Sequence, residues 1–372
     1  MDFSQPAVTT LHDLTGETPD APHEESAVVV PITGTSVEAV TPAAIFETLA
    51  AVGPADVVVP LRAPPGVAGA FADWVAKLSL PVTVLWCNSP AVETCLADHG
   101  LDGESGKGRD VWLGLGVAAD RADYVAVHDA DARSYDESWV PRLLAPLTGD
   151  HSFVKGYYAR VEDGRLYGRL ARLFVAPLLR AVADEHDDPL LEFLTAFRYP
   201  LAGEMAMTAP TARRLRAQRD WGLEIGLLGE VYDVVGPAGC AQVDLGVHRH
   251  DHRPVAGETG LATMAGAVGE TLCRVLEVHG LTPDYGTLPE RYRRAAARHV
   301  EQYAADAAHN GLSYDRDGER EQVEAYGEHI GPPGADTRLP AWEGTAVSAT
   351  EIATASARAL DAVRTTPEMD DA

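Results

Sequence analysis

The stretch Tyr124-Val-Ala-Val-His-Asp-Ala-Asp131 decides the fold. It opens with a short apolar run, typical of a buried strand, and ends in two carboxylates one residue apart. In an extended chain, side chains at positions i and i+2 point the same way, so Asp129 and Asp131 are expected to converge. Open α/β sheets bind ligands beyond the carboxyl ends of their strands, where paired carboxylates suit Mg²⁺ or Mn²⁺. Because Asp-x-Asp is also common in turns, an ordinary turn is the alternative.

Short β-rich runs alternate with amphipathic stretches around this segment. Before it come Val57–Pro60, Val67–Leu78, Val82–Trp86, Ala91–Asp98 and Asp110–Ala119. This alternation predicts βαβ units and a mostly parallel sheet, with Val57–Pro60 as its first strand. From Glu270 to about Ile330 the pattern becomes helical, most clearly over Leu288–Ala305, which predicts a C-terminal helical appendage.

Both ends of the chain lack apolar periodicity. Residues 1–25 mix Pro, Gly, Thr, Asp and Glu, and residues 331–372 do much the same, apart from a short helix expected near Glu351–Val363. We expect two mobile tails. The predicted division is therefore a tail over 1–25, an α/β domain over 26–269, a helical region over 270–330 and a second tail over 331–372.

Composition restricts the partners. The 372 residues include 30 basic and 56 acidic side chains, a formal net charge of -26 that repels nucleic acid and anionic membrane surfaces. No run approaches the roughly 18 apolar residues of a membrane span, and the N-terminus lacks the basic and apolar regions of a signal peptide. We therefore expect a cytoplasmic protein without nucleic acid or membrane partners; a homodimer is left open.

The basic residues are almost all arginine, since the lysines are only Lys77, Lys107 and Lys155. Acid-rich, lysine-poor surfaces are typical of proteins from salt-accumulating organisms, so the composition predicts a halophilic protein. An ordinary acidic cytosolic protein is the alternative. The cysteines are scattered without CxxC spacing and are expected to be free thiols: Cys87, Cys95, Cys240 and Cys273.

Gly103-Glu-Ser-Gly-Lys-Gly108 contains a Gly-Lys pair, but its spacing differs from that of a phosphate-binding P-loop. What remains is a glycine loop that brings Lys107 to the start of the following helix, a place that favours an anion. A solvated loop lysine is the alternative.

Histidines recur in His248-Arg-His-Asp-His252, after the mostly apolar run Val243–Val247. If the strand geometry persists, His248, His250 and His252 share one face and could bind a metal. If the strand ends at Val247, they diverge as a surface cluster.

Three further segments, Phe153–Tyr158, Pro200–Glu204 and Trp221–Gly226, place glycine-flanked polar groups beside apolar runs. Each could be a turn or a helix cap. Glu224 could equally be a buried carboxylate paired with an arginine or an active-site group.

In this order the motifs resemble those of the glucosyl-3-phosphoglycerate synthases, retaining glycosyltransferases of the GT-A fold. The similarity covers about Val57 to Val278. Its motifs are Gly106–Gly108, Asp129–Asp131, Val154–Gly156, Pro200–Glu204, Glu224–Leu228, and Gln242–Gly246 leading to His250 and Arg253-Pro254.

The resemblance implies a Rossmann-like GT-A domain with a mostly parallel sheet and a C-terminal helical appendage. It implies metal-dependent transfer of a sugar, expected to be glucose, from a nucleoside diphosphate donor to 3-phosphoglycerate, in compatible-solute synthesis. Asp131 and His250 would hold Mg²⁺ or Mn²⁺, and His248 and His252 would lie behind these ligands or on the surface.

The resemblance also assigns the substrate contacts. Lys107 would face the donor phosphate or base, and Glu224 would lie near the acceptor hydroxyl, which makes these two the expected catalytic residues. The donor-binding residues would be Pro60, Asn88, Lys107, Asp129 and Leu201. The acceptor-binding residues would be Arg169 first, then Arg165, Glu224 and Arg253.

The chain departs from the family pattern at three places. Where the family has an Asn-Glu turn after its first strand, Pro60 is followed by Leu-Arg-Ala-Pro-Pro-Gly66. The next strand ends in Cys87-Asn88-Ser89 instead of an aspartate. The family's Gly-Arg-x-Thr acceptor loop becomes Gly164-Arg165 or Gly168-Arg169, without the threonine.

Two other functions compete with this one. Asp129-Ala-Asp131 and Asp220-Trp-Gly222 are also similar to mannosylglycerate synthases, which use the unphosphorylated acid. An enzyme of that kind, or another glycosyltransferase with a small acid as acceptor, is the first alternative. A regulator that binds nucleotide sugars without turnover is the other alternative. A nucleotidyltransferase is disfavoured, because its glycine-rich Arg-Lys signature is missing.

Overall fold

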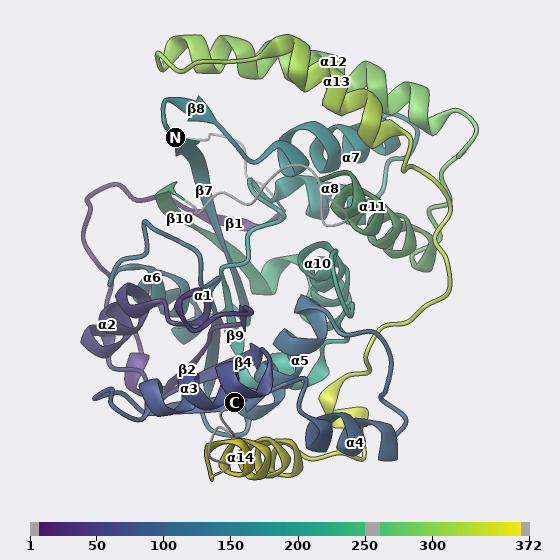
Figure 1. The fold of residues 1–372 in the computed structure, drawn as a ribbon. Coiled ribbons are helices and arrows are strands. Elements are labelled where there is room, and N and C mark those ends of the chain that lie inside the picture. The colour runs from purple at the N-terminus through teal and green to yellow at the C-terminus, as the bar shows by residue number, and fades with distance from the viewer. Residues whose placement is uncertain (1–6, 250–260, 366–372) are drawn as a thin grey trace, which may run out of the picture.

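A computed structural model describes residues 7–249 and 261–365 (Figure 1). Within these ranges ten strands form one sheet, in the order β1-β10-β7-β9-β6-β2-β4-β3, with β5 beside β4 and β8 beside β7. The strands are β1 (Thr9–Leu11), β2 (Ser26–Val29), β3 (Ile32–Thr33), β4 (Asp56–Arg62), β5 (Val82–Trp86), β6 (Tyr124–Val127), β7 (Phe153–Glu162), β8 (Arg165–Leu166), β9 (Met205–Thr208) and β10 (Cys240–His248).

The sheet is mostly parallel, which confirms the prediction. The antiparallel pairs are β9 with β6, β9 with β7, and β8 with β7. Strand β2 is buried on both faces: Ala27 and Val29 pack into one hydrophobic core, and Val28 packs into the other. Such two-sided burial is expected of parallel strands covered by helices, and it makes a continuous apolar run.

Helices cover both faces of the sheet (Figure 1). They are α1 (Val37–Val40), α2 (Ala43–Val52), α3 (Pro65–Val75), α4 (Pro90–Asp98), α5 (Lys107–Ala119), α6 (Trp139–Leu144), α7 (Ala176–Ala183), α8 (Pro189–Ala196), α9 (Ala209–Arg214), α10 (Leu223–Val234), α11 (Leu261–Val278), α12 (Leu288–His309), α13 (Arg316–Gly327) and α14 (Ala349–Thr365). The predicted helical appendage corresponds to α11 to α13, and the clearest predicted helix is α12.

The predicted start of the sheet is wrong. Strand β2 precedes Val57–Pro60 and lies between β4 and β6 at the centre of the sheet. Residues 1–25 were expected to be a tail, yet Thr9–Leu11 form β1, which pairs in parallel with β10. The apolar run of β2 is short and is soon interrupted by Pro31, which hides it from a search for longer alternating segments.

The predicted C-terminal tail also needs correction, because residues 331–365 pack onto the α/β domain. The Trp342 ring stacks on the Trp112 ring of α5, with centroids 4.2 Å apart, and each indole N–H donates to a backbone carbonyl. The helix expected near Glu351–Val363 is α14, which lies beside α3, α4 and β5 (Figure 1). The Ser356 hydroxyl accepts from the Trp86 amide at 2.7 Å and donates to the Val84 carbonyl at 3.1 Å.

Candidate active site

Lys107 begins α5, and close backbone packing fixes where that helix starts. The Arg109 amide donates to the Arg219 carbonyl at 2.8 Å. A Cβ on Gly108 would lie 2.8 Å from the carbonyl carbon of Gln218, closer than real contacts allow. Gly108 therefore allows the start of α5 to pack against residues 218–220.

Three of the predicted site residues meet at this point. The Lys107 ammonium lies 2.7 Å from Oδ1 of Asp129 and 2.9 Å from Oε1 of Glu224. Asp129 follows β6, and Glu224 lies in the first turn of α10. Burial alone would lower the pKa of Lys107, but the two carboxylates outweigh it and raise that pKa, so the lysine is a cation between two anions.

The Pro200–Glu204 motif lies directly behind Asp129. A Cβ on Gly203 would be 2.6 Å from Cγ of Asp129, so only a glycine leaves room for this carboxylate. The Lys155 ammonium donates to the Ala202 carbonyl at 2.7 Å, and the Gly156 amide donates to the Glu204 carbonyl at 2.9 Å. Burial lowers the pKa of Lys155 to about 8, although Glu224 and Glu204 oppose that shift. Strand β7 thus holds the loop against which Asp129 rests.

A buried polar cluster that sequence analysis did not single out lies next to this loop. The side chains of Glu204, His128 and His248 are almost inaccessible to solvent, and Oε1 of Glu204 is 3.7 Å from Nε2 of His248. Burial acts to raise the pKa of Glu204, but the histidines favour its carboxylate and the pKa falls to about 2. Burial lowers the pKa of His128 to about 4. Glu204 is therefore anionic and His128 neutral near pH 7.

His248 is buried in β10, with its ring centroid 4.4 Å from that of Tyr158 and 5.5 Å from that of Trp139. His248 was expected either behind the metal ligands or on the surface, and the structure shows it buried behind the site. The sequence held a signal for this cluster, because Glu204 closes one quoted motif and His128 lies within the stretch that decides the fold.

The remaining donor residues lie on other elements than Lys107. Pro60 is buried within β4. The Asn88 side chain accepts from the Ala63 amide at 3.1 Å, just beyond β5. Leu201 is half-buried in the loop before Gly203. The structure brings Lys107, Asp129 and Glu224 together and leaves the donor roles of these three as predictions.

The acceptor arginines face the helical region. Arg169 donates to Oε1 of Gln322 at 3.4 Å and lies 3.9 Å from Glu319, both on α13. Arg165 is exposed on β8. Arg253, the fourth acceptor residue, lies outside the described ranges. The acceptor roles of both described arginines therefore remain predictions.

Carboxylate oxygen and imidazole nitrogen suit Mn²⁺ or Mg²⁺, so the expected donor set of Asp131 and His250 fits that ion chemically. Asp131 is half-buried in the loop after β6. His250 and His252 lie outside the described residues. In residues 7–249 and 261–365, no group of three or more candidate ligands is gathered.

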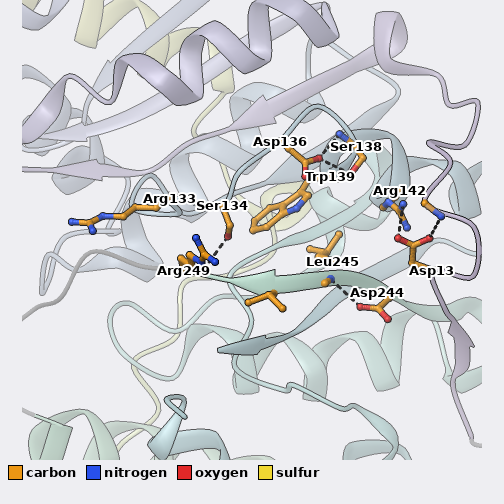
Figure 2. Close-up of a pocket in the computed structure, with 13 residues that line it drawn as sticks. Asp13, Arg133, Ser134, Asp136, Ser138, Trp139, Arg142, Asp244, Leu245 and Arg249 are labelled. Atoms are coloured by element: carbon orange, nitrogen blue, oxygen red, sulfur yellow. Dashed lines mark hydrogen bonds and ion pairs between the residues drawn. The ribbon is translucent and has the colours of Figure 1, made fainter. Parts of the chain in front are cut away.

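A cavity of about 440 Å³ opens beside this loop (Figure 2). Arg133 and Arg249 lie at one end, where the Arg249 amide donates to the Ser134 hydroxyl at 3.0 Å. The ion pair of Arg142 with Asp13, 2.9 Å long, lies at the other end. This cavity is not lined by Lys107, Asp129 or Glu224. It is therefore a separate cavity next to the site.

In the part of the chain that the structure describes, no helix has the length and apolarity needed to cross a membrane. No protein-family model matches the chain. Two curated proteins, both glucosyl-3-phosphoglycerate synthases, are similar to it over most of its length. The protein of Methanococcoides burtonii is 36% identical over 282 residues, which cover 72% of this chain and 70% of the relative. That of Persephonella marina is 35% identical over 268 residues, covering 68% and 66%.

The solved structures that resemble this chain include a glucosyl-3-phosphoglycerate synthase as well. Glucosyl-3-phosphoglycerate synthase from Mycobacterium tuberculosis in complex with phosphoglyceric acid aligns with a TM-score of 0.55 and 26% identity, over 74% of this chain and 89% of the other. Mannosyl-3-phosphoglycerate synthase from Rubrobacter xylanophilus aligns with a TM-score of 0.54 and 25% identity, over 68% and 74%. The chain belongs to the glucosyl-3-phosphoglycerate synthase family.

Proposed function

We propose that this protein transfers glucose from a nucleoside diphosphate donor to the free hydroxyl of 3-phosphoglycerate, with retention at the sugar carbon. The contact of Lys107 with Asp129 and Glu224 carries the proposal, because it joins three motifs of the family in one place. A solved relative supports the substrates: the Mycobacterium tuberculosis enzyme in complex with Mn²⁺, UDP-glucose and phosphoglyceric acid is 25% identical, with a TM-score of 0.55 over 74% of this chain and 89% of the other.

The roles of the residues follow from their charges. Lys107 places a cation at the N-terminus of α5, where it offsets negative charge on the departing diphosphate. Asp129 orients that ammonium. Asp131 and His250 would hold Mg²⁺ or Mn²⁺, which would supply further charge neutralisation. Glu224 is proposed to accept a hydrogen bond from the acceptor hydroxyl, and front-face attack by that hydroxyl needs no covalent nucleophile.

We also propose a cytoplasmic, salt-adapted enzyme, on the strength of its charge of -26 and its three lysines among 30 basic residues. Arg169 is proposed to bind the acceptor phosphate after leaving Gln322, with Arg165 and Arg253 as further contacts. A guanidinium suits a phosphate because its parallel N–H groups match two oxygens. The proposed extent of the transferase domain is 26–269, with the helical region over 270–330.

The likeness to mannosyl-3-phosphoglycerate synthase favours one second candidate, mannosyl transfer to the same acceptor. A donor panel separates the two: UDP-glucose, GDP-glucose and GDP-mannose, each with 3-phosphoglycerate or glycerate, at high KCl with Mg²⁺ or Mn²⁺. Mass spectrometry should find glucosyl-3-phosphoglycerate, and EDTA should abolish it. A mannosylated product would support the second candidate. Faster transfer to glycerate would support a mannosylglycerate synthase-like enzyme, and donor binding without any product would support a regulator.

A further inference from the structure

We propose that Arg160, together with Tyr199, binds the carboxylate of the acceptor. This inference rests on the proposed function and extends it, since it assigns the acceptor's second anionic group to residues that neither the family motifs nor the comparisons point to. It separates recognition of the carboxylate from recognition of the phosphate.

Strand pairing places Arg160 beside His248, at the carboxyl end of β10. Strands β7 and β10 are parallel neighbours, and Arg160 pairs with His248. Paired residues of neighbouring parallel strands project to the same face of a sheet, as do residues two apart on one strand. The ring contact between Tyr158 and His248, 4.4 Å between centroids, shows that this face is shared. His248 precedes the expected metal ligand His250 by two residues in the sequence.

Tyr199 and the loop that contains Gly168 and Arg169 lie next to Tyr158 and Arg160. The Tyr199 ring is 4.8 Å from that of Tyr158. A Cβ on Gly168 would lie 2.9 Å from the Tyr199 hydroxyl, and the Tyr167 amide donates to the Arg160 carbonyl at 2.8 Å. The strand, the tyrosine and the loop that carries Arg169 therefore form one wall.

Within the described ranges the Arg160 guanidinium forms no ion pair, although the Asp131 carboxylate is near enough to act on its charge. No carboxylate of residues 7–249 or 261–365 forms an ion pair with it, whereas Arg172, on the same wall, lies 2.8 Å from Glu319. Among the described residues, its buried Nε has no hydrogen-bond partner. Burial opposes its charge, but the Tyr199 hydroxyl and the Asp131 carboxylate keep its pKa raised. In a chain with 56 acidic residues, a half-buried guanidinium without an ion pair is suited to an anionic ligand.

The chemistry of 3-phosphoglycerate selects the group that Arg160 meets. Its one free hydroxyl is on the carbon that bears the carboxylate, and the phosphate is at the opposite end. The hydroxyl must approach the donor sugar, which the predicted metal ligand Asp131 helps to hold. The anion nearest Asp131, and hence nearest Arg160, is then the carboxylate, which a guanidinium binds through two parallel hydrogen bonds. Arg169, which faces α13, is left for the phosphate.

The test compares Arg160→Gln, Arg160→Lys and Arg169→Gln with the wild type. Two probes compete with 3-phosphoglycerate: glycerate, which has only the carboxylate, and glycerol 3-phosphate, which has only the phosphate. In Arg160→Gln we expect the KM for 3-phosphoglycerate and the inhibition constant of glycerate to rise about tenfold or more. The inhibition constant of glycerol 3-phosphate and the KM for the donor should change less than about twofold. Arg169→Gln should show the opposite pattern with the two probes, and Arg160→Lys should recover part of the loss.

Arg180→Gln, a change of an exposed arginine on α7, is the matched control and should leave all constants unchanged. Melting midpoints show that each variant is folded. An equal rise for both probes in Arg160→Gln, or an unchanged constant for glycerate, overturns the inference. Failure of the wild type to glucosylate 3-phosphoglycerate would instead refute the proposed function, so the two failures are distinguishable.

Discussion

Replacing Gly203 by alanine tests whether the loop behind Asp129 sets the geometry of the site. The new Cβ would lie 2.6 Å from Cγ of Asp129, whereas ordinary contacts begin at 3.4 Å, so the carboxylate would have to retreat by about 0.8 Å. A shift of that size would change the distance and the angle of its contact with the Lys107 ammonium, now 2.7 Å long. Displacements of this size near reacting groups cost roughly a hundredfold in rate.

The assay is kcat/KM for glucosyl transfer, with unfolding followed in parallel. We expect Gly203→Ala to lower kcat/KM about a hundredfold and the free energy of unfolding by only about 1 to 3 kcal/mol, the usual cost of overpacking. Gly66→Ala is the matched control, because a Cβ at Gly66 meets nothing within 4 Å. Wild-type kcat/KM in a folded Gly203→Ala protein would refute the idea that this loop positions Asp129.

Four further outcomes are expected. Asp131→Ala and His250→Ala should each abolish metal-dependent turnover while His252→Ala keeps most of it; equal losses in the two histidine variants would restore the three-histidine site. The folded pKa of Glu204 is about 2, below its ordinary value, so its charge stabilises the fold fully above about pH 4.5 and loses that effect as the pH falls toward 2. In melting curves, the difference in stability between the wild type and Glu204→Gln should therefore shrink by an amount on the order of 3 kcal/mol over that window. Molar KCl should raise the melting midpoint substantially, since salt screens the negative surface, and coinciding curves at low and high KCl would remove the halophily prediction. Trp342→Ala should lower the free energy of unfolding by about 3 to 5 kcal/mol in denaturant titrations, and a near-neutral effect would show that residues 331–365 add little to the core.

Segments with a periodic apolar pattern could be predicted from the sequence. Short segments that are held in place by a few tertiary contacts could not. The helix expected over Leu288–Ala305 is α12, Leu288–His309, because its apolar face repeats over several turns. Strand β2 shows no such repeat, since four residues buried on both faces carry only a brief apolar run. The C-terminal segment has low hydrophobicity and reads as a tail, yet the single ring of Trp342 and the hydroxyl of Ser356 tie it to the domain.

The site, too, could be predicted from the sequence only in part. The residue types at Lys107, Asp129 and Glu224 could be picked out from local motifs, but their meeting depends on the tertiary fold, because they are 22 and 117 residues apart. The cluster of Glu204 and its histidines escaped notice, since burial decides its pKa values and burial cannot be read from a single motif. Arg160 was missed for a related reason: an arginine without an ion pair is recognised only when every neighbouring carboxylate has been placed.

The bond between Ser356 and Trp86 has a consequence for biogenesis. It joins residues 270 positions apart, so the helix that covers the outer edge of β5 is synthesised long after the strand itself. Until it arrives, the nascent protein presents an open strand edge, the kind of surface on which other chains can pair and aggregate. Yield in the cell therefore depends on a segment that touches none of the reacting groups, and selection can act on that segment through protein quality control alone.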